Sequence, residues 1–234
     1  MINTITPQLT LGLSLQDEAT FDNFCSGKNA EIVVQLKNAV AKQSDKVIYL
    51  CGNQDQGKSH LLQACCHYAQ QLNLTSVYIP LANFAAFTPD ILMGLEILDI
   101  VCLDDVHLIA GKKEWEEQLF HLYNRMVATS NSLIFSARDL PQEIQLSLPD
   151  LISRLSWGMV YPLYTLLDEE KLSILILRAK NRGMNLSEEV GKYILTHYPR
   201  RMSALFVALD KLDKASLAAQ RRLTIPFIKE VLQI

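Results

Sequence analysis

The chain has 234 residues, of which 49% are apolar and 20% are charged, a composition typical of a globular protein with a core of ordinary size. Its 22 basic and 25 acidic residues give a net charge of −3, which argues against strong direct DNA binding over a broad basic face. The sequence has no signal peptide, no apolar run long enough for a membrane helix and no Cys-x-x-Cys pair among its five cysteines, so we expect a cytoplasmic protein with no membrane partner.

The first predicted elements are an arm, a helix and a strand. Residues 1–20 are expected to form an extended N-terminal arm. Apolar residues at helical spacing predict a helix over 28–43. The continuous apolar run 47–51 is typical of a buried parallel strand, and a glycine loop and a helix over 58–72 follow it.

Strands and helices continue to alternate as far as Pro162. Short apolar runs predict strands over 77–80, 98–103, 132–136 and 159–161, and a long helix is expected over 113–130. This alternation predicts an α/β fold with a parallel five-stranded sheet flanked by helices.

After Pro162 the sequence shows only helical patterns, which predict a small all-α domain. Asp168 is a suitable N-cap for its first helix, and Gly183 is a suitable stop. Ser187 would begin the next helix, and Pro226 would lie in the first turn of the last one. The expected divisions are an arm over 1–20, an α/β domain over 21–165 and a helical domain over 166–234.

The clearest functional signal is a phosphate-binding loop. Residues 52–59 read Gly-Asn-Gln-Asp-Gln-Gly-Lys-Ser, between a predicted strand and a predicted helix. Glycines in such a loop let successive backbone N–H groups and the helix N-terminus face a phosphate. Lys58 would place a charge at the β- and γ-phosphates, and Ser59 would coordinate Mg²⁺. A chance glycine turn is the alternative, and it would have to coincide with both flanking elements.

Two adjacent carboxylates, Asp104 and Asp105, follow the predicted strand over 98–103. Because parallel strands end at one edge of a sheet, we expect both side chains beside the phosphate loop. Asp104 would hold Mg²⁺ directly or through water, and Asp105 would orient or activate an attacking water. A pair of aspartates after a strand is common on protein surfaces, so this assignment depends on the loop upstream.

Two arginines outside the loop are candidates for contact with phosphate. Arg154 lies past the fourth predicted strand, too far along the domain to reach the chain's own phosphate easily. It could enter a neighbouring protein's site as an arginine finger, and a surface salt bridge is an equally good interpretation. Arg200, at the start of a helix in the second domain, could fold over bound nucleotide, and a solvated helix cap formed with Arg201 is the alternative.

The arm carries a short peptide motif, Gln8-Leu9-Thr10-Leu11-Gly12-Leu13. Alternating leucines in an extended terminus suit binding in an apolar groove. An edge strand of the chain's own sheet is the alternative. A near-copy, Gln145-Leu146-Ser147-Leu148, lies inside the predicted folded region and shows how easily such a motif arises.

Histidines and tryptophans indicate no further site. The five histidines have no convincing metal-binding spacing, and the helix face shared by His60 and His67 is attributed to packing. Trp115 and Trp157 are likewise expected to be packing residues.

Together these motifs resemble the AAA+ core of the bacterial initiator DnaA. The resemblance rests on the phosphate loop and on residues 103–112 and 148–158, and it covers nearly the whole chain. The segment Thr20-Phe21-Asp22-Asn23-Phe24 also resembles the segment that lines the nucleotide base in this family. The sequence ends at Ile234, without the DNA-binding domain that follows in DnaA, as in the short regulatory members of the family that inactivate DnaA.

The resemblance implies a role for each matching residue. ADP or ATP would be held by the base segment, the phosphate loop and the sensor 2 arginine, which are Phe21, Phe24, Gly52, Gln56, Gly57, Lys58, Ser59, His60 and Arg200. Ser59 and Asp104 would hold Mg²⁺, Asp105 would be catalytic, and Arg154 would be the finger that acts on ATP bound to DnaA. The arm would bind the apolar pocket of the DNA polymerase sliding clamp through Gln8, Leu9, Leu11 and Leu13.

Two positions depart from the pattern of the superfamily. Asp105 stands where most AAA+ enzymes carry Glu, although DnaA resembles this chain in having two aspartates. Arg138 stands at the end of the sensor 1 strand, where DnaA has an acidic residue. The resemblance therefore implies weak intrinsic ATP hydrolysis and an active form that holds ADP.

Three functions are compatible with these observations. The first is a negative regulator of DNA replication initiation that binds the sliding clamp and DnaA, alone or as a homodimer, and is nucleoid-associated through the clamp. The second is a stand-alone AAA+ ATPase such as a helicase loader. The third is a small-molecule kinase with Arg138, Arg178 and Arg182 as its lid arginines, against which the helical second domain argues.

Overall fold

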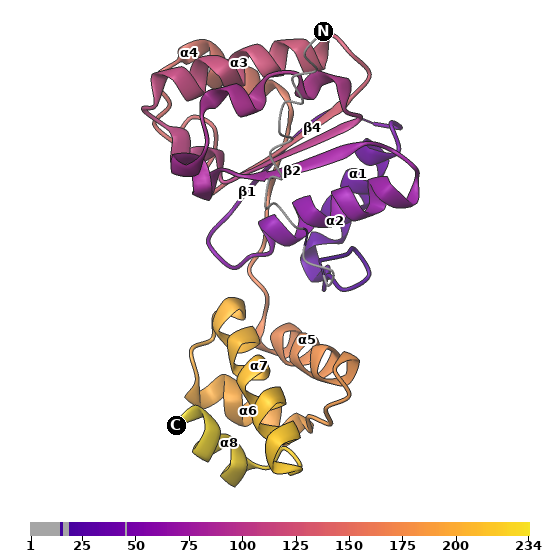
Figure 1. The fold of residues 1–234 in the computed structure, drawn as a ribbon, viewed down its shortest axis with the longest axis vertical. Coiled ribbons are helices and arrows are strands. Elements are labelled where there is room, and N and C mark those ends of the chain that lie inside the picture. Colours follow the sequence, from indigo (N-terminus) through magenta and orange to yellow (C-terminus); the bar gives the residue numbers. More distant parts are fainter. Residues whose placement is uncertain (1–14, 16–18, 45) are drawn as a thin grey trace, which may run out of the picture.

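The structure is a computed structural model that describes residue 15, residues 19–44 and residues 46–234. The arm motif predicted at Gln8, Leu9, Leu11 and Leu13 lies outside the described residues. Within them, a region built around a β-sheet is followed, beyond Pro162, by a bundle of helices (Figure 1).

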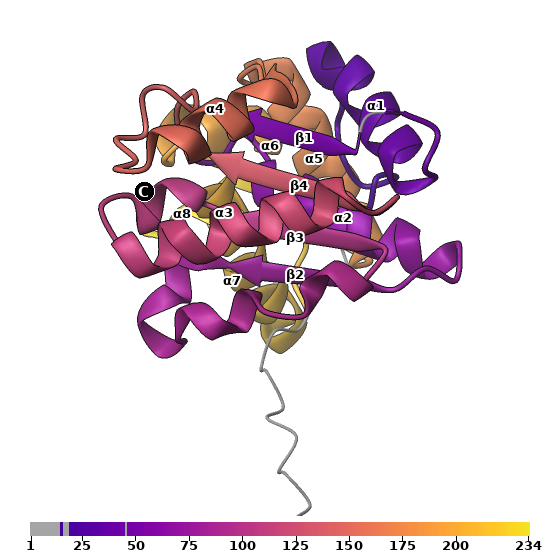
Figure 2. The same ribbon diagram turned by 90° about the horizontal axis from the view of Figure 1, so that it is seen from above.

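A five-stranded parallel sheet forms the centre of the first region. Its strands are β1 (Val47–Cys51), β2 (Ser76–Pro80), β3 (Ile100–Asp104), β4 (Ser132–Ala137) and β5 (Met159–Pro162). They lie in the order β2-β3-β4-β1-β5, and Figure 2 shows the first four side by side. Register pairs Cys51 with Ala137 and Pro80 with Asp104, so neighbouring strands end together at one edge. The predicted parallel five-stranded sheet is confirmed.

Helices cover both faces of the sheet. On one face, α1 (Ala30–Val40) and α2 (Lys58–Gln71) pack over strand side chains such as Ile48 and Leu50. On the other face, α3 (Lys113–Val127) and α4 (Pro149–Trp157) pack over side chains such as Tyr49. Successive side chains of a strand point to opposite faces, so a sheet buried on both faces requires unbroken apolar strands. Short 3-10 turns complete this region at Gly27–Asn29, Leu81–Ala86, Pro89–Leu92, Leu95–Ile97 and Val106–Ile109.

The second region, called the lid here, has its own apolar core. Its helices are α5 (Asp168–Asn181), α6 (Glu188–His197), α7 (Met202–Ala219) and α8 (Ile225–Leu232). Gly183 follows α5 with φ +75°, a left-handed conformation that ends the helix as predicted. Ser187 caps α6 through the backbone N–H of Val190, and Pro226 lies in the first turn of α8. In the part of the chain that the structure describes, no helix has the length and apolar character needed to cross a membrane.

Two local predictions are wrong. Asp168 is the first residue of α5 and not its N-cap, because the backbone N–H of Leu167 is satisfied by the Glu170 carboxylate at 2.7 Å. Trp157 is not a packing residue, since its side chain is 76% exposed, whereas Trp115 is 6% exposed in the core.

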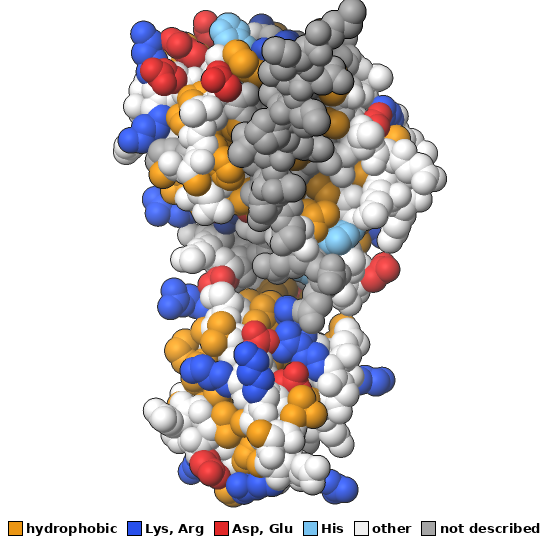
Figure 3. All heavy atoms as spheres, in the orientation of Figure 1, with side chains coloured by type: hydrophobic (Ala, Val, Ile, Leu, Met, Phe, Trp, Pro, Cys, Tyr) orange, Lys and Arg blue, Asp and Glu red, His pale blue; other side chains and the backbone are white. Residues whose placement is uncertain are grey.

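The mixture of charges on the surface agrees with the nearly equal numbers of basic and acidic residues in the sequence. On the face drawn in Figure 3, Lys and Arg side chains are interspersed with Asp and Glu, in the sheet region and in the lid alike. The five cysteines are all free thiols, and four of them are buried.

Candidate functional site

The loop over residues 52–59 joins β1 to α2 and has the backbone that phosphate binding needs. Gly57 has φ +89°, and a Cβ at this position would lie 2.7 Å from the Phe24 ring, so only glycine fits both requirements. The helix α2 begins at Lys58, and its first N–H groups have no intrahelical acceptor. These amides are the groups that bind a phosphate at a helix N-terminus.

Lys58 is folded back on the loop. Its ammonium donates to the carbonyl oxygens of Gly52 at 2.6 Å and Asn53 at 2.9 Å, and its side chain is nearly buried. Burial lowers the pKa of Lys58, and the negative charges of Asp105, Asp104 and Asp55 oppose that shift. A bound phosphate would offer this buried ammonium an anion close to its present carbonyl partners.

Asp104 lies at the end of β3 and accepts two hydroxyl groups. Tyr78 O–H donates to its Oδ2 at 2.7 Å, and Ser136 O–H donates to its Oδ1. The Asp104 side chain is 2% exposed. The pKa of the Tyr78 hydroxyl is raised, mainly because that group is buried and secondly because the negative charge of Asp104 lies beside it. Hydroxyl and carboxylate oxygens are ligands that Mg²⁺ accepts. The side chains of Ser59 and Asp104 therefore fit the cation in kind, and the two hydroxyl partners of Asp104 favour contact through water.

Asp105 is set apart from Asp104 by its backbone. Its φ of +58° is left-handed, and its N–H donates to Ser136 Oγ at 2.9 Å. Burial and the neighbouring charge of Asp104 raise the pKa of Asp105, while His107 and Lys58 act in the opposite direction. The two predicted aspartates thus lie near Lys58. The Asp104 carboxylate is buried, whereas the Asp105 carboxylate is partly exposed.

Arg138 follows β4 on the same side of the sheet. Its guanidinium pairs with Asp139, with Nε to Oδ2 at 3.1 Å, and is 64% exposed. Its backbone N–H meets His107 Nδ1 at 3.3 Å. A polar cavity lies beside these residues, lined by His107, Ala110, Gly111, Arg138, Asp139, Glu143, Ile144 and Gln145.

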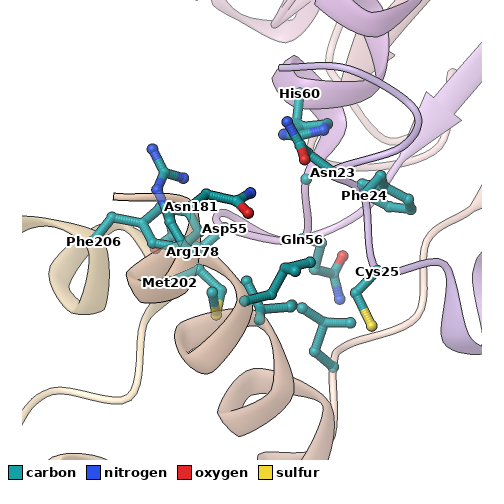
Figure 4. A pocket seen from close by; sticks show the side chains of 14 residues that line it. Asn23, Phe24, Cys25, Asp55, Gln56, His60, Arg178, Asn181, Met202 and Phe206 are labelled. Atoms are coloured by element: carbon teal, nitrogen blue, oxygen red, sulfur yellow. The ribbon is translucent and has the colours of Figure 1, made fainter. Parts of the chain in front are cut away.

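A second cavity lies between the phosphate loop and the lid (Figure 4). The sheet region contributes Asn23, Phe24, Cys25, Asp55, Gln56, Gly57 and His60, the linker before α5 contributes Leu166, and the lid contributes Ile174, Leu177, Arg178, Asn181, Met202 and Phe206. Its wall is mainly apolar, and the Arg178 guanidinium stacks on Phe206 with Cζ 3.8 Å from the ring centre. An apolar cavity with a few polar groups beside a phosphate loop has the character of a site for a flat aromatic base.

The lid and the linker touch the loop directly. Ser203 O–H donates to Asp55 Oδ2 at 3.1 Å, which joins α7 to the phosphate loop. Gln56 Nε2 donates to Thr165 Oγ1 at 2.7 Å, so its side chain holds the linker. The Asn29 side chain exchanges two hydrogen bonds with the backbone of Tyr164, at 2.8 and 3.2 Å. These contacts fix the linker over 163–167 beside the phosphate loop.

Several sequence-predicted residues meet at this cavity, namely Phe24, Gln56, Gly57 and His60. His60 Nε2 also lies 2.7 Å from the carbonyl oxygen of Thr20, and burial lowers the pKa of His60. Gly52, Lys58 and Ser59 belong to the adjoining phosphate loop and start of α2, with Asp104 and Asp105 alongside.

The structure does not bring Phe21 or Arg200 to the cavity. Phe21 packs edge-on against Tyr68, with ring centres 5.9 Å apart, because its neighbours in the core are the side chains of α1 and α2. Arg200 pairs with Asp168 at 3.1 Å and donates to the carbonyl oxygen of Leu195, so it joins lid segments to one another. Neither residue contributes to the wall that faces the loop.

The arginine that lines the cavity is Arg178, considered above only as a kinase lid residue. It lies on α5 with Ile174, Leu177 and Asn181, at spacings of three and four residues. Residues so spaced share one helix face. This face of α5 is apolar at one end and carries Arg and Asn at the other. The pattern is visible in the sequence alone and is the signal by which the cavity wall could have been predicted.

Arg154 lies apart from the cavity, on α4. Its guanidinium Cζ is 5.2 Å from the centre of the Trp157 ring. It makes no hydrogen bond or ion pair with any residue of the described part of the chain. The surface salt bridge considered as an alternative is therefore absent among these residues.

A phosphate loop after the first strand, carboxylates after the third and a helical lid define a P-loop protein of the AAA+ class. The chain belongs to the bacterial DnaA ATPase family, whose model matches residues 15–162, and its residues 168–232 match the lid domain of Hda. It is thus a DnaA-like AAA+ protein of the Hda type.

Solved structures agree with this fold. Domain III of the replication initiation protein DnaA from Thermotoga maritima superimposes with a TM-score of 0.82 at 22% identity, over 94% of this chain and 98% of that one. AMPPCP-bound DnaA from Aquifex aeolicus gives 0.71 at 22% identity, over 86% of this chain and 67% of that one. A RuvB variant from Thermotoga maritima gives 0.67 at 14% identity, over 90% and 69%.

Proposed function

We propose that this protein is a nucleotide-binding negative regulator of DNA replication initiation that acts on DnaA. A DnaA ATPase domain joined to an Hda lid supports a DnaA-related regulator. In this proposal the chain binds ADP in its active form and stimulates hydrolysis of the ATP held by DnaA. It works in the cytoplasm, near the nucleoid when clamp-bound.

Nucleotide binding is supported by the phosphate loop and the cavity beside it. Phosphates would lie on the α2 N-terminus with Lys58, and the base would enter the cavity between Phe24 and the lid. A related DnaA structure was obtained with AMPPCP bound. Ser59 and Asp104 would hold Mg²⁺, which neutralises phosphate charge when bound.

One observation supports the proposal that the protein acts on ATP bound to a partner. Arg154 lies outside the chain's own cavity and makes no ion pair with any described residue, so its guanidinium donors are available to an external anion. A guanidinium inserted into a neighbour's site stabilises the charge of the transferring phosphoryl group. Arg154 is therefore proposed as the arginine finger.

The test is hydrolysis of ATP prebound to DnaA, measured with DNA-loaded clamp and saturating regulator. Arg154→Ala should remove most of the stimulation, because finger arginines contribute about 10³-fold or more to phosphoryl transfer. Arg222→Ala, which changes an exposed lid arginine, is the matched control. Full stimulation by the Arg154→Ala protein would show that the finger assignment is wrong.

Clamp binding is proposed for the arm residues Gln8, Leu9, Leu11 and Leu13. The competing copy at 145–148 is less suitable, since Leu146 is 7% exposed and the N–H groups of Ser147 and Leu148 are bound by Glu116. Deletion of residues 8–13 should abolish binding to purified clamp in a pull-down. Retained affinity would shift the assignment to the internal copy.

The alternative, a stand-alone AAA+ ATPase such as a helicase loader, predicts a different result. The purified protein alone would then turn over ATP rapidly, and Lys58→Ala would abolish that activity. Weak turnover by the isolated protein, together with strong stimulation of DnaA, would favour the regulator. A homodimer is part of the proposal only if sedimentation detects one with ADP bound.

A further inference from the structure

Trp157 is the most exposed tryptophan of the chain. Its side chain is 76% exposed at the end of α4, and Met159, which lies two residues further on and begins β5, is 43% exposed. Tryptophan is a large, rigid and mainly apolar side chain that usually becomes buried in a core or an interface. A well-ordered fold that leaves it in water at this point requires a reason.

The ring lies against a single charged group, the guanidinium of Arg154, at 5.2 Å from Cζ to the ring centre. The two residues are three positions apart on α4, so they share one face of the helix. A cation over an indole is attracted by the ring quadrupole. This contact limits the rotamers of a long side chain and leaves its N–H donors available.

The helix that carries the pair is firmly held. Leu151 and Leu155 are fully buried on its other face. Ser156 Oγ accepts a hydrogen bond from Gln142 Nε2 at 2.9 Å and donates to the Ile152 carbonyl at 2.7 Å. The backbone position of Trp157 is therefore fixed by the packing of α4, whereas the side chain of Arg154 is long and has many rotatable bonds.

Close packing continues at the next residue. A Cβ on Gly158 would lie 2.8 Å from the carbonyl oxygen of Val47, so the chain there is pressed against β1. The chain is thus held on both sides of Trp157, at Ser156 and at Gly158. Among the described residues, Arg154 makes no hydrogen bond or ion pair that would direct its side chain elsewhere.

We propose that Trp157 is the positioning residue of the arginine finger. Its ring holds the Arg154 guanidinium outward in the free protein and becomes covered when the ATP-holding AAA+ domain of DnaA takes up that guanidinium. We choose this partner on the basis of charge. The Arg154 guanidinium has no ion pair among the described residues, and a bound triphosphate supplies an anion that it can bind. This inference rests on the proposed function of Arg154.

Single-turnover hydrolysis of DnaA-bound ATP at saturating regulator tests the role. Trp157→Ala should lower the rate constant by about twofold to fivefold, the size of an exposed cation–π contact. Trp157→Phe should recover most of the loss, because a ring remains under the guanidinium. In an Arg154→Ala background, Trp157→Ala should have no further effect.

The outcomes separate this inference from the proposed function. No stimulation by the unchanged protein, or no effect of Arg154→Ala, contradicts the finger itself. A strong effect of Arg154→Ala with none of Trp157→Ala leaves the finger standing and overturns the positioning role. An added loss in the double variant also overturns it, since Trp157 would then act independently as a docking contact.

A second measurement needs no partner. Protein labelled with 5-fluorotryptophan should give two fluorine signals, because the chain has two tryptophans, and Trp157→Phe assigns them. Arg154→Ala should shift the Trp157 signal, and Arg138→Ala, a control at another exposed arginine, should not. A Trp157 signal unmoved by Arg154→Ala would overturn the stack.

Discussion

The phosphate loop and the last turn of α4, where we propose that Arg154 acts, differ in how their charged side chains are satisfied. At the phosphate loop, Lys58 and Asp104 are nearly buried and already hydrogen-bonded to neighbouring groups. In the last turn of α4, Arg154 makes no hydrogen bond or ion pair with any described residue, and its guanidinium lies against the exposed indole of Trp157. A site that binds its own ligand can be preorganised internally, whereas a group meant for another protein has to keep its donors free until the partner arrives.

A useful consequence is that changes in one of these two regions should leave the other unaffected. Residues of the loop and lid should alter ADP binding, and residues that hold α4 should alter stimulation of DnaA. The following changes, from the largest expected effect to the smallest, can break or sharpen this separation.

Glu116→Ala should have the largest effect. The buried carboxylate accepts hydrogen bonds from the N–H groups of Gly111, Ser147 and Leu148 at 2.7 to 3.1 Å, just before α4 begins. Removing it leaves three N–H groups without this acceptor, and we expect a loss of about 3–5 kcal/mol in the free energy of unfolding. Urea unfolding measures this loss, with Glu117→Ala at the half-exposed neighbour as the control. A loss equal to that of the control would contradict the anchoring role.

Lys58→Ala comes next, on the nucleotide side. Loss of a charge-assisted contact to phosphate should weaken ADP binding by about tenfold to a hundredfold. Isothermal titration with ADP measures the change, and Arg154→Ala should bind ADP as the unchanged protein does. If Arg154→Ala also lost ADP affinity, the two regions would not be independent.

The pH dependence of stability reports on His60. Burial holds its pKa below the ordinary value of 6.5, so the unfolded chain binds the proton more readily. The contribution is therefore fully present above about pH 6.5 and is lost as the pH falls below it. His60→Gln should flatten the decline in stability between about pH 7 and pH 5, measured by urea unfolding. His121→Gln, at an exposed position, serves as the control, and an equal effect there would contradict the assignment.

Ser203→Ala should have the smallest effect. It removes the hydrogen bond from α7 to Asp55 in the loop, a contact near the surface. ADP affinity should fall by about twofold to threefold, with no change in single-turnover stimulation once ADP is saturating. A larger loss would mean that this one contact governs closure of the lid.

The sheet and the loop could be predicted because each is encoded in short stretches. The apolar run at 47–51 and the segment 132–136, with its apolar centre between two serines, predict strands buried on both faces, and they correspond to β1 and β4 with nearly unchanged bounds. Spacing within residues 52–59 places glycine where a left-handed backbone is needed, as at Gly57. Asp104 and Asp105 follow from the rule that parallel strands end at one edge.

The parts that were missed depend on packing between distant segments. Arg178 reaches the cavity and Arg200 does not, although both are lid arginines. Asp168 could cap a helix by its type, yet its carboxylate meets Arg200 because α5 and the segment before α7 come together. Trp157 looks like a core residue by composition, and only the placement of α4 leaves it in water.

The sequence by itself determined the class of fold and the chemistry of the phosphate loop, since local periodicity and local backbone requirements are properties of consecutive residues. Tertiary structure alone decided which arginine faces the cavity, and that Arg154 meets an exposed ring with no ion pair among the described residues. Those outcomes are set by how α4 and the lid pack on residues far away in the chain, a balance of many small contacts that no short motif records.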